Sequence, residues 1–353
     1  MNVRRLTAHL LIVAACTSSA LAGAMKTLTV AQQGKADFRT VQEAVDHAPA
    51  EGAIIRIAPG TYREKIHVST PNIELIGTGK LPQDVVLSWN DSAKSAGGTG
   101  KSGSVSVDAD GFAAENLTIE NTWELEHERL EEGSQAVALL MSSDKAVLDR
   151  VRLLGAQDTL YANSRTCHDN LPKDGSAPAP GRSACLASRQ YFHDCYIEGH
   201  VDYIFGDAKA VFDHCELHSR RHDTVMLTAQ SKHFPEEDSG YYFLHCSITG
   251  QDAGDKVVLG RPWRDYSTVL FYDTDIEQKI AADGWSEWSG RLKTSNYREY
   301  KSHGPGVNDG RRIVSYPALS SEEEKSWTPS KLLSAPDRWN PTAGVARLRK
   351  LVR

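Results

Sequence analysis

The sequence predicts an all-β fold, a parallel β-helix, and two observations lead to it. A short pattern recurs along the chain: two mostly polar residues, a marker position, one more polar residue and then an aliphatic one. The shortest interval between markers is near 20 residues and the others are longer by irregular amounts, as expected of a solenoid whose coils carry loops of different length. The markers are residues 117, 151, 195, 215, 246 and 274, at intervals of 34, 44, 20, 31 and 28.

The same register pairs two aspartates. Counting seven residues on from marker 151 gives Asp158, and seven on from marker 195 gives Asp202. If these copies stack as neighbouring coils, the strands that carry the carboxylates lie about 4.8 Å apart, the ordinary strand spacing. A single aspartate here could equally be a cap on a turn between strands. The pair, beside an apolar run, predicts two carboxylates that share one site.

Residues 1–24 have the composition of a secretory signal peptide: a basic start, an apolar stretch and a small-residue segment that suits cleavage after Ala22. Residues 13–16 also resemble the lipobox before a lipid-bearing cysteine. Two locations therefore stay open. The protein is either secreted, or it is a periplasmic or outer-membrane lipoprotein anchored through Cys16. No later apolar run approaches the roughly 18 residues that a membrane span needs.

The remaining chain, residues 25–353, is expected to form a single domain. Removing residues 1–24 takes away two arginines and no acids, so the formal charge moves from −6 to −8. An acidic chain is a poor candidate for binding nucleic acid. A length of 329 residues is large for one compact core, but a solenoid grows along one axis. We expect an elongated monomer.

Several elements outside the repeat can be placed. Apolar residues at helical spacing over residues 37–48 predict a short helix that covers the N-terminal end of the solenoid. Residues 60–64 resemble a turn with structural polar contacts, and the Gly, Ser and Lys content of residues 91–104 predicts a flexible loop. Past Ser320, an acidic run and a Trp-Thr-Pro break indicate a C-terminal helical cover.

The cysteines suggest disulfides, because the chain carries an export signal. Cys195 and Cys215 share the marker position on adjacent coils, near the Cα separation that a disulfide accepts, and we expect them to pair. The alternative is two stacked buried thiols. Cys167 and Cys185 bracket a segment rich in Pro and Gly, and a bridge between them would close that loop. Cys246 would then be the odd thiol.

Several stretches between Gly60 and Gly306 resemble pectin methylesterases, a family of carbohydrate esterases. Each motif alone is weak, but the same order along the chain makes the resemblance specific. It implies a right-handed parallel β-helix that hydrolyses the C6 methyl esters of galacturonate in pectin, releasing methanol and pectate, with no metal or organic cofactor. The matching stretches are residues 60–64, 135–139, 155–160, 199–206 and 259–263, followed by 284–288, 299–300 and 304–306.

The resemblance also implies roles for individual residues. The chain contains no Gly-x-Ser-x-Gly elbow and no His-Glu-x-x-His spacing, which leaves a carboxylate mechanism. Asp202 is the implied nucleophile, Asp158 the acid and base, and Arg261 the partner that keeps Asp202 ionised. Gln157 and Gln135 would donate amide N–H groups to the oxyanion. An ordinary ion pair and an internal glutamine ladder are the structural alternatives.

Aromatic residues in the same motifs are candidates for sugar binding, because a ring can face the C–H groups of a pyranose. Trp263 is the strongest candidate, followed by Tyr161 and Phe205. Tyr203 and Trp285 are further candidates. Alternation places Tyr203 and Phe205 on the same face as each other, where core packing is an equal interpretation.

Other functions remain open at this stage. A β-helix glycosidase also uses paired carboxylates, separated by roughly 5 to 9.5 Å across a glycosidic bond, and a calcium-using lyase would need more acidic ligands. A non-catalytic, carbohydrate-binding envelope solenoid is the third reading, which the complete residue set disfavours. Residues 163–186 depart from the more compact spacing of the family, and His200 occupies a variable position to which we assign no role.

Overall fold

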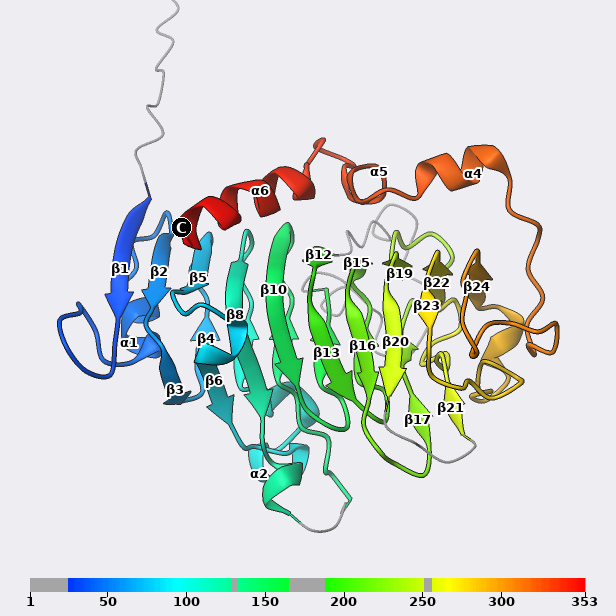
Figure 1. Ribbon diagram of the computed structural model, residues 1–353, viewed down its shortest axis with the longest axis horizontal. Helices are drawn as coiled ribbons and strands as arrows, with labels where there is room; N and C mark the ends of the chain where they lie inside the picture. Colours follow the sequence, from blue (N-terminus) through cyan, green and yellow to red (C-terminus); the bar gives the residue numbers. More distant parts are fainter. Residues whose placement is uncertain (1–24, 128–131, 165–187, 251–255, 353) are drawn as a thin grey trace, which may run out of the picture.

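The computed structural model describes residues 25–127, 132–164, 188–250 and 256–352. Every strand pairing in this part of the chain is parallel. The strands follow one another along a single axis in chain order (Figure 1), so the predicted parallel β-helix is confirmed. The predicted signal peptide and the Cys167–Cys185 pair lie outside the described residues.

The solenoid has three faces of parallel strands, which enclose its core. The first face contains β1 (Lys26–Val30), β2 (Ala53–Ile57), β5 (Ile73–Gly77), β8 (Ala113–Asn121), β10 (Ala146–Leu154), β12 (Arg189–His193), β15 (Lys209–Asp213), β19 (Gly240–Leu244), β22 (Thr268–Tyr272) and β24 (Asn296–Tyr300). The long strands β8 and β10 bend and continue into the second face, with β3 (Gly60–Arg63), β6 (Val85–Trp89), β13 (Tyr196–Gly199), β16 (Glu216–Ser219), β20 (Ser247–Gly250) and β23 (Asp275–Ile276).

The third face is a separate sheet. It contains β4 (Ile66–Val68), β7 (Val105–Val107), β9 (Leu139–Met141), β11 (Leu160–Ala162), β14 (Ile204–Gly206) and β18 (Thr228–Gln230), and a two-stranded sheet of β17 (Val225–Met226) and β21 (Val257–Val258) lies apart from it. Short 3₁₀ turns interrupt the loops: η1 (Pro82–Asp84), η2 (Thr99–Lys101), η3 (Glu124–Glu126) and η4 (Arg291–Lys293).

Strand pairing confirms the predicted register of the markers. Val151 pairs with Leu117, and the neighbouring pairs align the later markers coil by coil. A left-handed residue precedes each marker and bends the chain from the first face to the second. Such backbone is uncommon outside Asn, Asp and His, which supply five of the six positions. These residues are Asn116, Arg150, Asp194, His214, His245 and Asp273, with φ between 50° and 56°.

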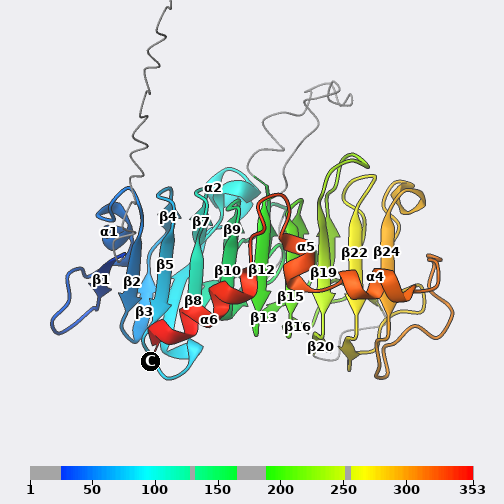
Figure 2. The same ribbon diagram turned by 90° about the horizontal axis from the view of Figure 1, so that it is seen from above.

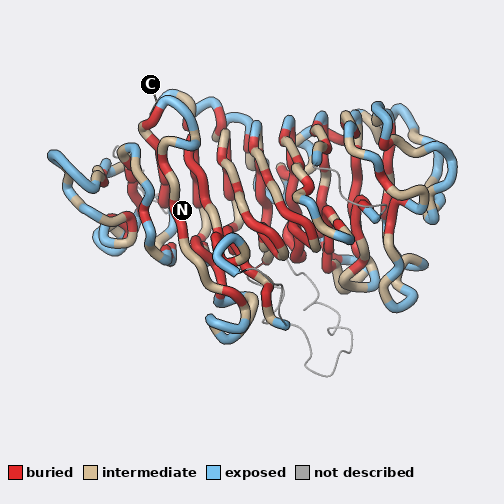
Figure 3. Tube along the Cα trace, turned by 60° about the horizontal axis from the view of Figure 1, so that its bottom comes forward, coloured by how far each residue is buried: buried red, intermediate tan, exposed pale blue. Residues whose placement is uncertain are grey.

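The interior is a set of stacked side-chain columns. Phe192, Phe212, Phe243 and Phe271 occupy one column, with successive ring centroids 4.6, 4.5 and 4.5 Å apart. Buried positions run along the strands, and exposed positions gather at the turns and ends (Figure 3). Identical residues stack well here because parallel neighbours repeat the same side-chain direction at one strand spacing.

The predicted N-terminal helix is present as α1 (Val41–Asp46), which buries Val41, Ala44 and Val45 against the first coils. Glu64 receives hydrogen bonds from the main-chain N–H groups of Val41 and Gln42, both at 2.8 Å. A carboxylate at this end of a helix satisfies N–H groups that have no partner within the helix. Glu64 therefore has the structural polar contacts expected of residues 60–64, although residues 60–63 form strand β3 and not the predicted turn.

The C-terminal segment covers the side of the solenoid. Its helices α4 (Ser321–Ser326), α5 (Pro329–Leu333) and α6 (Pro341–Val352) cross the outer surface of the first face, back toward the N-terminal coils (Figures 1 and 2). Leu333 and Leu348 are fully buried there, and Arg349 Nε donates to Asp149 Oδ2 at 2.7 Å. Among the described residues, none of the helices has the length and apolar character for a membrane span.

The segment predicted as a flexible loop has regular structure. Residues 91–104 contain α2 (Ala93–Ala96), which is capped by the Ser92 side chain, and the turn η2. The composition that suggested a loop is also the composition of helix caps, since Ser accepts from N–H groups and Gly adopts left-handed backbone. Gly97, at φ 79°, ends α2 in this way.

The predicted disulfide between Cys195 and Cys215 is absent: both are free and buried, as is Cys246 on the next coil. The side chains are in register and point the same way into the core, so each thiol faces a main-chain carbonyl of the preceding coil. The sulfur-to-oxygen distances are 3.6 Å from Cys195 to Leu148 and 3.4 Å from Cys215 to Phe192. The alternative prediction, two stacked buried thiols, is confirmed.

This arrangement predicts that Cys195, Cys215 and Cys246 carry no bridge in the purified protein. Alkylation with iodoacetamide, after unfolding without reductant, should label all three, whereas the folded protein should resist labelling because the thiols are buried. Peptide mass mapping measures both states. A peptide pair joined through residues 195 and 215 would contradict the prediction.

Candidate active site

The two predicted aspartates occupy equivalent positions on neighbouring coils. Each lies at the bend from the second face to the third, where Leu160 pairs with Ile204 two residues further on. The Asp158 N–H donates to the Val201 carbonyl at 3.1 Å. Both aspartates have left-handed backbone, with φ of 66° at Asp158 and 51° at Asp202, which aspartate tolerates better than most residues. The register counted from the sequence is confirmed.

A glycine three residues before each aspartate allows the two bends to stack. A Cβ on Gly199 would lie 2.3 Å from the Tyr203 Cβ and 2.6 Å from the Ala156 carbonyl oxygen. A Cβ on Gly155 would lie 2.6 Å from the Thr159 hydroxyl oxygen. The close approach of the Ala156 carbonyl leaves no room for a side chain at position 199, so the glycine there lets the bend of Asp202 pack against the bend of Asp158.

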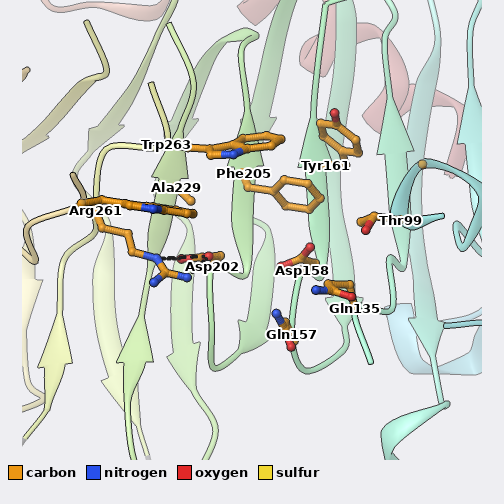
Figure 4. Close-up of a pocket in the computed structure, with 12 residues that line it drawn as sticks. Thr99, Gln135, Gln157, Asp158, Tyr161, Asp202, Phe205, Ala229, Arg261 and Trp263 are labelled. Atoms are coloured by element: carbon orange, nitrogen blue, oxygen red, sulfur yellow. Dashed lines mark hydrogen bonds and ion pairs between the residues drawn. The ribbon is translucent and has the colours of Figure 1, made fainter. Parts of the chain in front are cut away.

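Both carboxylates line a cleft of about 460 Å³. Figure 4 shows the side chains of Trp263, Phe205 and Tyr161 on one side of the carboxylates, with Gln157 and Gln135 on the other. The cleft therefore has an aromatic wall and a wall of amide groups. Its lining residues are Thr99, Gly100, Gln135, Gln157, Asp158, Tyr161, Asp202, Phe205, Ala229, Arg261, Trp263 and Trp288.

Arg261 fixes one carboxylate and not the other. Its Nε donates to Asp202 Oδ1 at 2.9 Å and its Nη2 donates to Oδ2 at 2.6 Å, a two-pronged ion pair (Figure 4). The guanidinium also lies over the Trp288 ring, 4.1 Å from its centroid. Such a fork holds both the charge and the orientation of a carboxylate.

The environment separates the two acids. Burial, together with the neighbouring charge of Asp202, raises the pKa of Asp158 well above its usual range. Burial also raises the pKa of Asp202, but the hydrogen bonds and charge of Arg261 oppose that rise. Because adjacent carboxylates resist ionising together and the hydrogen bonds of Arg261 stabilise the charge of Asp202 alone, Asp158 is the more readily protonated of the two.

The amide of Gln157 is oriented by a neighbour. The Ser134 hydroxyl donates to Gln157 Oε1 at 3.2 Å, so the amide nitrogen is left to donate elsewhere. The side chains of Gln157 and Gln135 are only partly buried and line the cleft beside Asp158. Both glutamines thus offer N–H groups without adding charge.

The predicted aromatic residues divide into two groups. Tyr161 and Phe205 stack at 4.2 Å between ring centroids, and Trp263 packs against Phe205 at 5.9 Å, all three in the cleft. Tyr203 and Trp285 are instead buried in the core, with exposed fractions of 0% and 1%. Alternation failed for Tyr203 because the strand starts only at Ile204, after the left-handed Asp202.

The sequence did not identify every residue of the cleft. Trp288 was overlooked although it lies three positions beyond Trp285 in a recognised motif, because nothing in the motif distinguishes the two indoles. Thr99 and Gly100 belong to the segment predicted as a loop, and Ala229 carries no chemical signal.

Clusters able to hold a metal ion occur elsewhere in the described part of the chain. One contains His193, Asp213 and His214, and the other contains Asp149, His193 and Asp194. Both lie at the bends between the first and second faces. The carboxylates of the cleft lie at the bends between the second and third faces, and Arg261 is the partner of Asp202.

A cleft with paired acids, a guanidinium, amide donors and an aromatic wall, on a parallel β-helix, has the groups that a hydrolase needs. The family model "Pectinesterase" matches residues 27–168 and 184–336. The chain therefore belongs to the pectinesterase family, whose members are carboxylic ester hydrolases. The unmatched residues 169–183 fall within the segment predicted to depart from the family spacing.

Individual relatives agree with this assignment. Pectinesterase QRT1 of Arabidopsis thaliana is 36% identical over 327 residues, which cover 89% of this chain and 78% of that protein. Among solved structures, a pectin methylesterase from carrot is 28% identical with a TM-score of 0.76, covering 91% of this chain and 95% of its own. A pectin methylesterase in complex with a hexasaccharide is 25% identical with a TM-score of 0.69, covering 89% and 98%.

The raised pKa of Asp158 predicts a stability effect for Asp158→Asn. A carboxyl whose pKa is higher in the folded chain than in the unfolded chain stabilises the fold at pH values below its unfolded pKa, near 3.9. This contribution to stability is lost as the pH rises through the pKa that the carboxyl has in the folded chain. Asparagine does not ionise, so the variant should unfold at a higher temperature than the wild type at pH 9, with a smaller difference at pH 4.

Thermal unfolding at the two pH values measures this effect. Asp273→Asn is the matched control, since Asp273 has the same left-handed backbone, at φ 51°, on an exposed turn. An Asp158→Asn variant that is less stable than the wild type at pH 9 would contradict the argument that the burial of this carboxyl raises its pKa.

Proposed function

We propose that this enzyme hydrolyses the C6 methyl esters of galacturonate residues in pectin and releases methanol and pectate. Family membership supports the ester class, and the hexasaccharide complex of a relative supports a saccharide ligand for the cleft. The observation that carries the proposal is the pair of stacked aspartates of which Arg261 contacts only one. That asymmetry prepares one nucleophile and one proton donor.

The first half of the reaction forms an acyl-enzyme. The ionised Asp202 carboxylate attacks the ester carbonyl carbon, and the oxygen of the tetrahedral intermediate accepts hydrogen bonds from Gln157 and Gln135. The C–O bond to the methoxy group then breaks while Asp158 gives its proton to the departing oxygen. Methanol leaves, and C6 is joined to Asp202 as a mixed anhydride.

The second half returns the enzyme to its starting state. Asp158, now ionised, takes a proton from water, and the resulting hydroxide attacks the C6 carbonyl carbon of the anhydride. The bond between C6 and the Asp202 oxygen breaks, which frees the galacturonate carboxyl group and restores the Asp202 carboxylate. Asp158 is protonated again, so one water is consumed for each methanol released.

The aromatic wall suits the polymer. Trp263, Phe205 and Tyr161 present ring faces that can pack against the C–H groups of successive sugar rings. A substrate of this kind is extracellular, which agrees with the export signal predicted for residues 1–24. We therefore propose that the enzyme acts outside the cytoplasm as a monomer.

Replacement of the nucleophile tests the function most directly. Asp202→Asn keeps the size of the side chain but removes the attacking carboxylate, so kcat for methanol release from methylated pectin should fall by about 10⁴-fold or more. Methanol is measured against a pectate blank, together with reducing ends. Asp273→Asn should match the wild type.

Two outcomes would reject this function. One is methanol release by Asp202→Asn at a rate within tenfold of the wild type. The other is the appearance of reducing ends without methanol from the wild type, which would indicate cleavage of glycosidic bonds.

The Arg261 fork predicts a shift in the pH dependence of catalysis. In Arg261→Met the pKa of Asp202 should rise, because burial would act without the opposing cation. Catalysis needs ionised Asp202, so the acid side of the profile of kcat/KM against pH should move to higher pH and the plateau should fall.

Arg261→Lys is the informative companion, because it keeps the charge but lacks the planar fork. Its acid limb should remain close to that of the wild type, while its plateau should fall. An unchanged profile in Arg261→Met would remove Arg261 from the mechanism.

A further inference from the structure

A buried histidine lies two residues before the nucleophile, and both of its ring nitrogens are engaged. His200 is 1% exposed. Its Nδ1 lies 2.7 Å from the main-chain nitrogen of Val201, and its Nε2 lies 2.8 Å from Glu124 Oε2. Neither contact involves substrate or the reacting groups, and nothing in the proposed chemistry uses His200.

The neighbours determine the protonation of this ring. A main-chain N–H is always a donor, so the Val201 contact requires a lone pair on Nδ1 and places the ring hydrogen on Nε2, facing Glu124. His200 is therefore a neutral imidazole in this structure. Burial lowers the pKa of His200, Glu124 opposes that shift, and the nearby His222 and Arg220 reinforce it.

The contact spans three coils. Glu124 belongs to η3, in the loop between β8 and β9 that also carries Gln135, whereas His200 belongs to the bend that carries Asp202. The coil between them carries Asp158 and Gln157. Asn121 joins the η3 turn to the segment of Gln135, because its Oδ1 accepts from the Trp123 N–H and its Nδ2 donates to the Val137 carbonyl, both at 3.0 Å. The His200–Glu124 pair thus connects the coil of one amide donor to the bend of the nucleophile without passing through the acid.

The backbone of the same bend is held by the neighbouring coils on either side. The His200 N–H donates to the Ala156 carbonyl at 3.0 Å, and the Met226 N–H donates to the His200 carbonyl at 2.9 Å. These main-chain hydrogen bonds fix the position of the bend along the axis of the solenoid. The imidazole adds a link across that axis, since its Nδ1 accepts from the Val201 N–H and its Nε2 contacts Glu124 of the η3 turn.

We infer that the His200–Glu124 pair is a positioning device, which sets the Asp202 carboxylate relative to the amide of Gln135. The inference rests on the proposed function of the cleft. His200 is a positioning residue because it acts through Val201 and Glu124. Misplacement of a reacting group by about 1 Å can cost 10²-fold in rate, so the loss of this link is expected to lower kcat measurably.

The arrangement should also respond to acid. Protonation of His200 would place an N–H on Nδ1 against the N–H of Val201, so the acceptor of that hydrogen bond would be lost. Glu124, His222 and Arg220 are the charged or titratable groups that face the ring. The acid side of the kcat profile should therefore depend on two protons, one on Asp202 and one on His200.

The test uses His200→Leu, Glu124→Ala and the double variant, with methanol release as the assay. His200→Leu should lower kcat by about 10- to 100-fold with KM within about twofold of the wild type. Glu124→Ala should lower kcat in the same direction. The double variant should be no slower than His200→Leu, because both changes remove one link.

A pH profile separates positioning from general support of the fold. The fall of log kcat with pH on the acid side should be steeper in the wild type than in His200→Leu, since one titrating group is gone. His200→Asn offers an oxygen to the Val201 N–H in place of Nδ1 and should recover part of the lost kcat. His214→Leu, at an exposed turn on another bend, is the matched control and should keep the wild-type kcat.

Three results would overturn the inference. One is a wild-type kcat in His200→Leu, and another is additive losses in the double variant. The third is a loss of kcat that follows only the fraction of folded protein, with an unchanged acid slope. If His200→Leu does not fold, His200→Asn and Glu124→Ala carry the same comparison. A wild-type enzyme that releases no methanol would reject the proposed function instead, which is a separate outcome.

Discussion

In-register stacking of parallel coils is the constraint on which the rest of this structure depends. Because neighbouring strands run in the same direction at one spacing, a side chain at a given position on one coil meets the equivalent side chain on the next. The phenylalanine column in the core and the three buried thiols are both products of this rule. The same rule, applied at a bend that faces solvent, brings Asp158 beside Asp202.

Stacking of like residues is favourable in the core and costly at the cleft. Aromatic rings gain contact when they repeat, but two buried carboxylates repel and lose hydration. The molecule relieves this cost at one acid, where Arg261 forms a two-pronged ion pair, and leaves the other with its pKa raised by burial. The repeat thus supplies two equal acids, and a single arginine from a later coil makes them unequal.

The parts of the fold that could be predicted are those that the repeat determines. The spacing of seven residues from marker to aspartate survives in two coils because the bend between them has a constant length, so counting was enough to align Asp158 with Asp202. The pairing of Cys195 with Cys215 could not be decided by counting. Proximity of the Cα atoms is necessary for a disulfide, but the direction of the side chains decides whether one forms.

Residues in loops escaped prediction for a different reason. Trp288 and Thr99 reach the cleft from segments whose paths do not follow the repeat. The expectation that Tyr203 and Phe205 share a face was wrong, because a left-handed residue resets the alternation of the strand that follows it. In each case the residue is visible in the sequence, but the direction of its side chain depends on the geometry of a turn that only the structure shows.

The positions of the acids and their orientation therefore have separate origins. Coil register places Asp158 and Asp202, whereas loop residues orient the groups around them: Ser134 directs the Gln157 amide, and Glu124 holds His200 beside the nucleophile. Loops tolerate sequence change better than the stacked coils, because they are not bound to the strand spacing. Related enzymes can accordingly share the acids and differ in how firmly those acids are held, and this difference would appear in kcat and its pH dependence before it appeared in the fold.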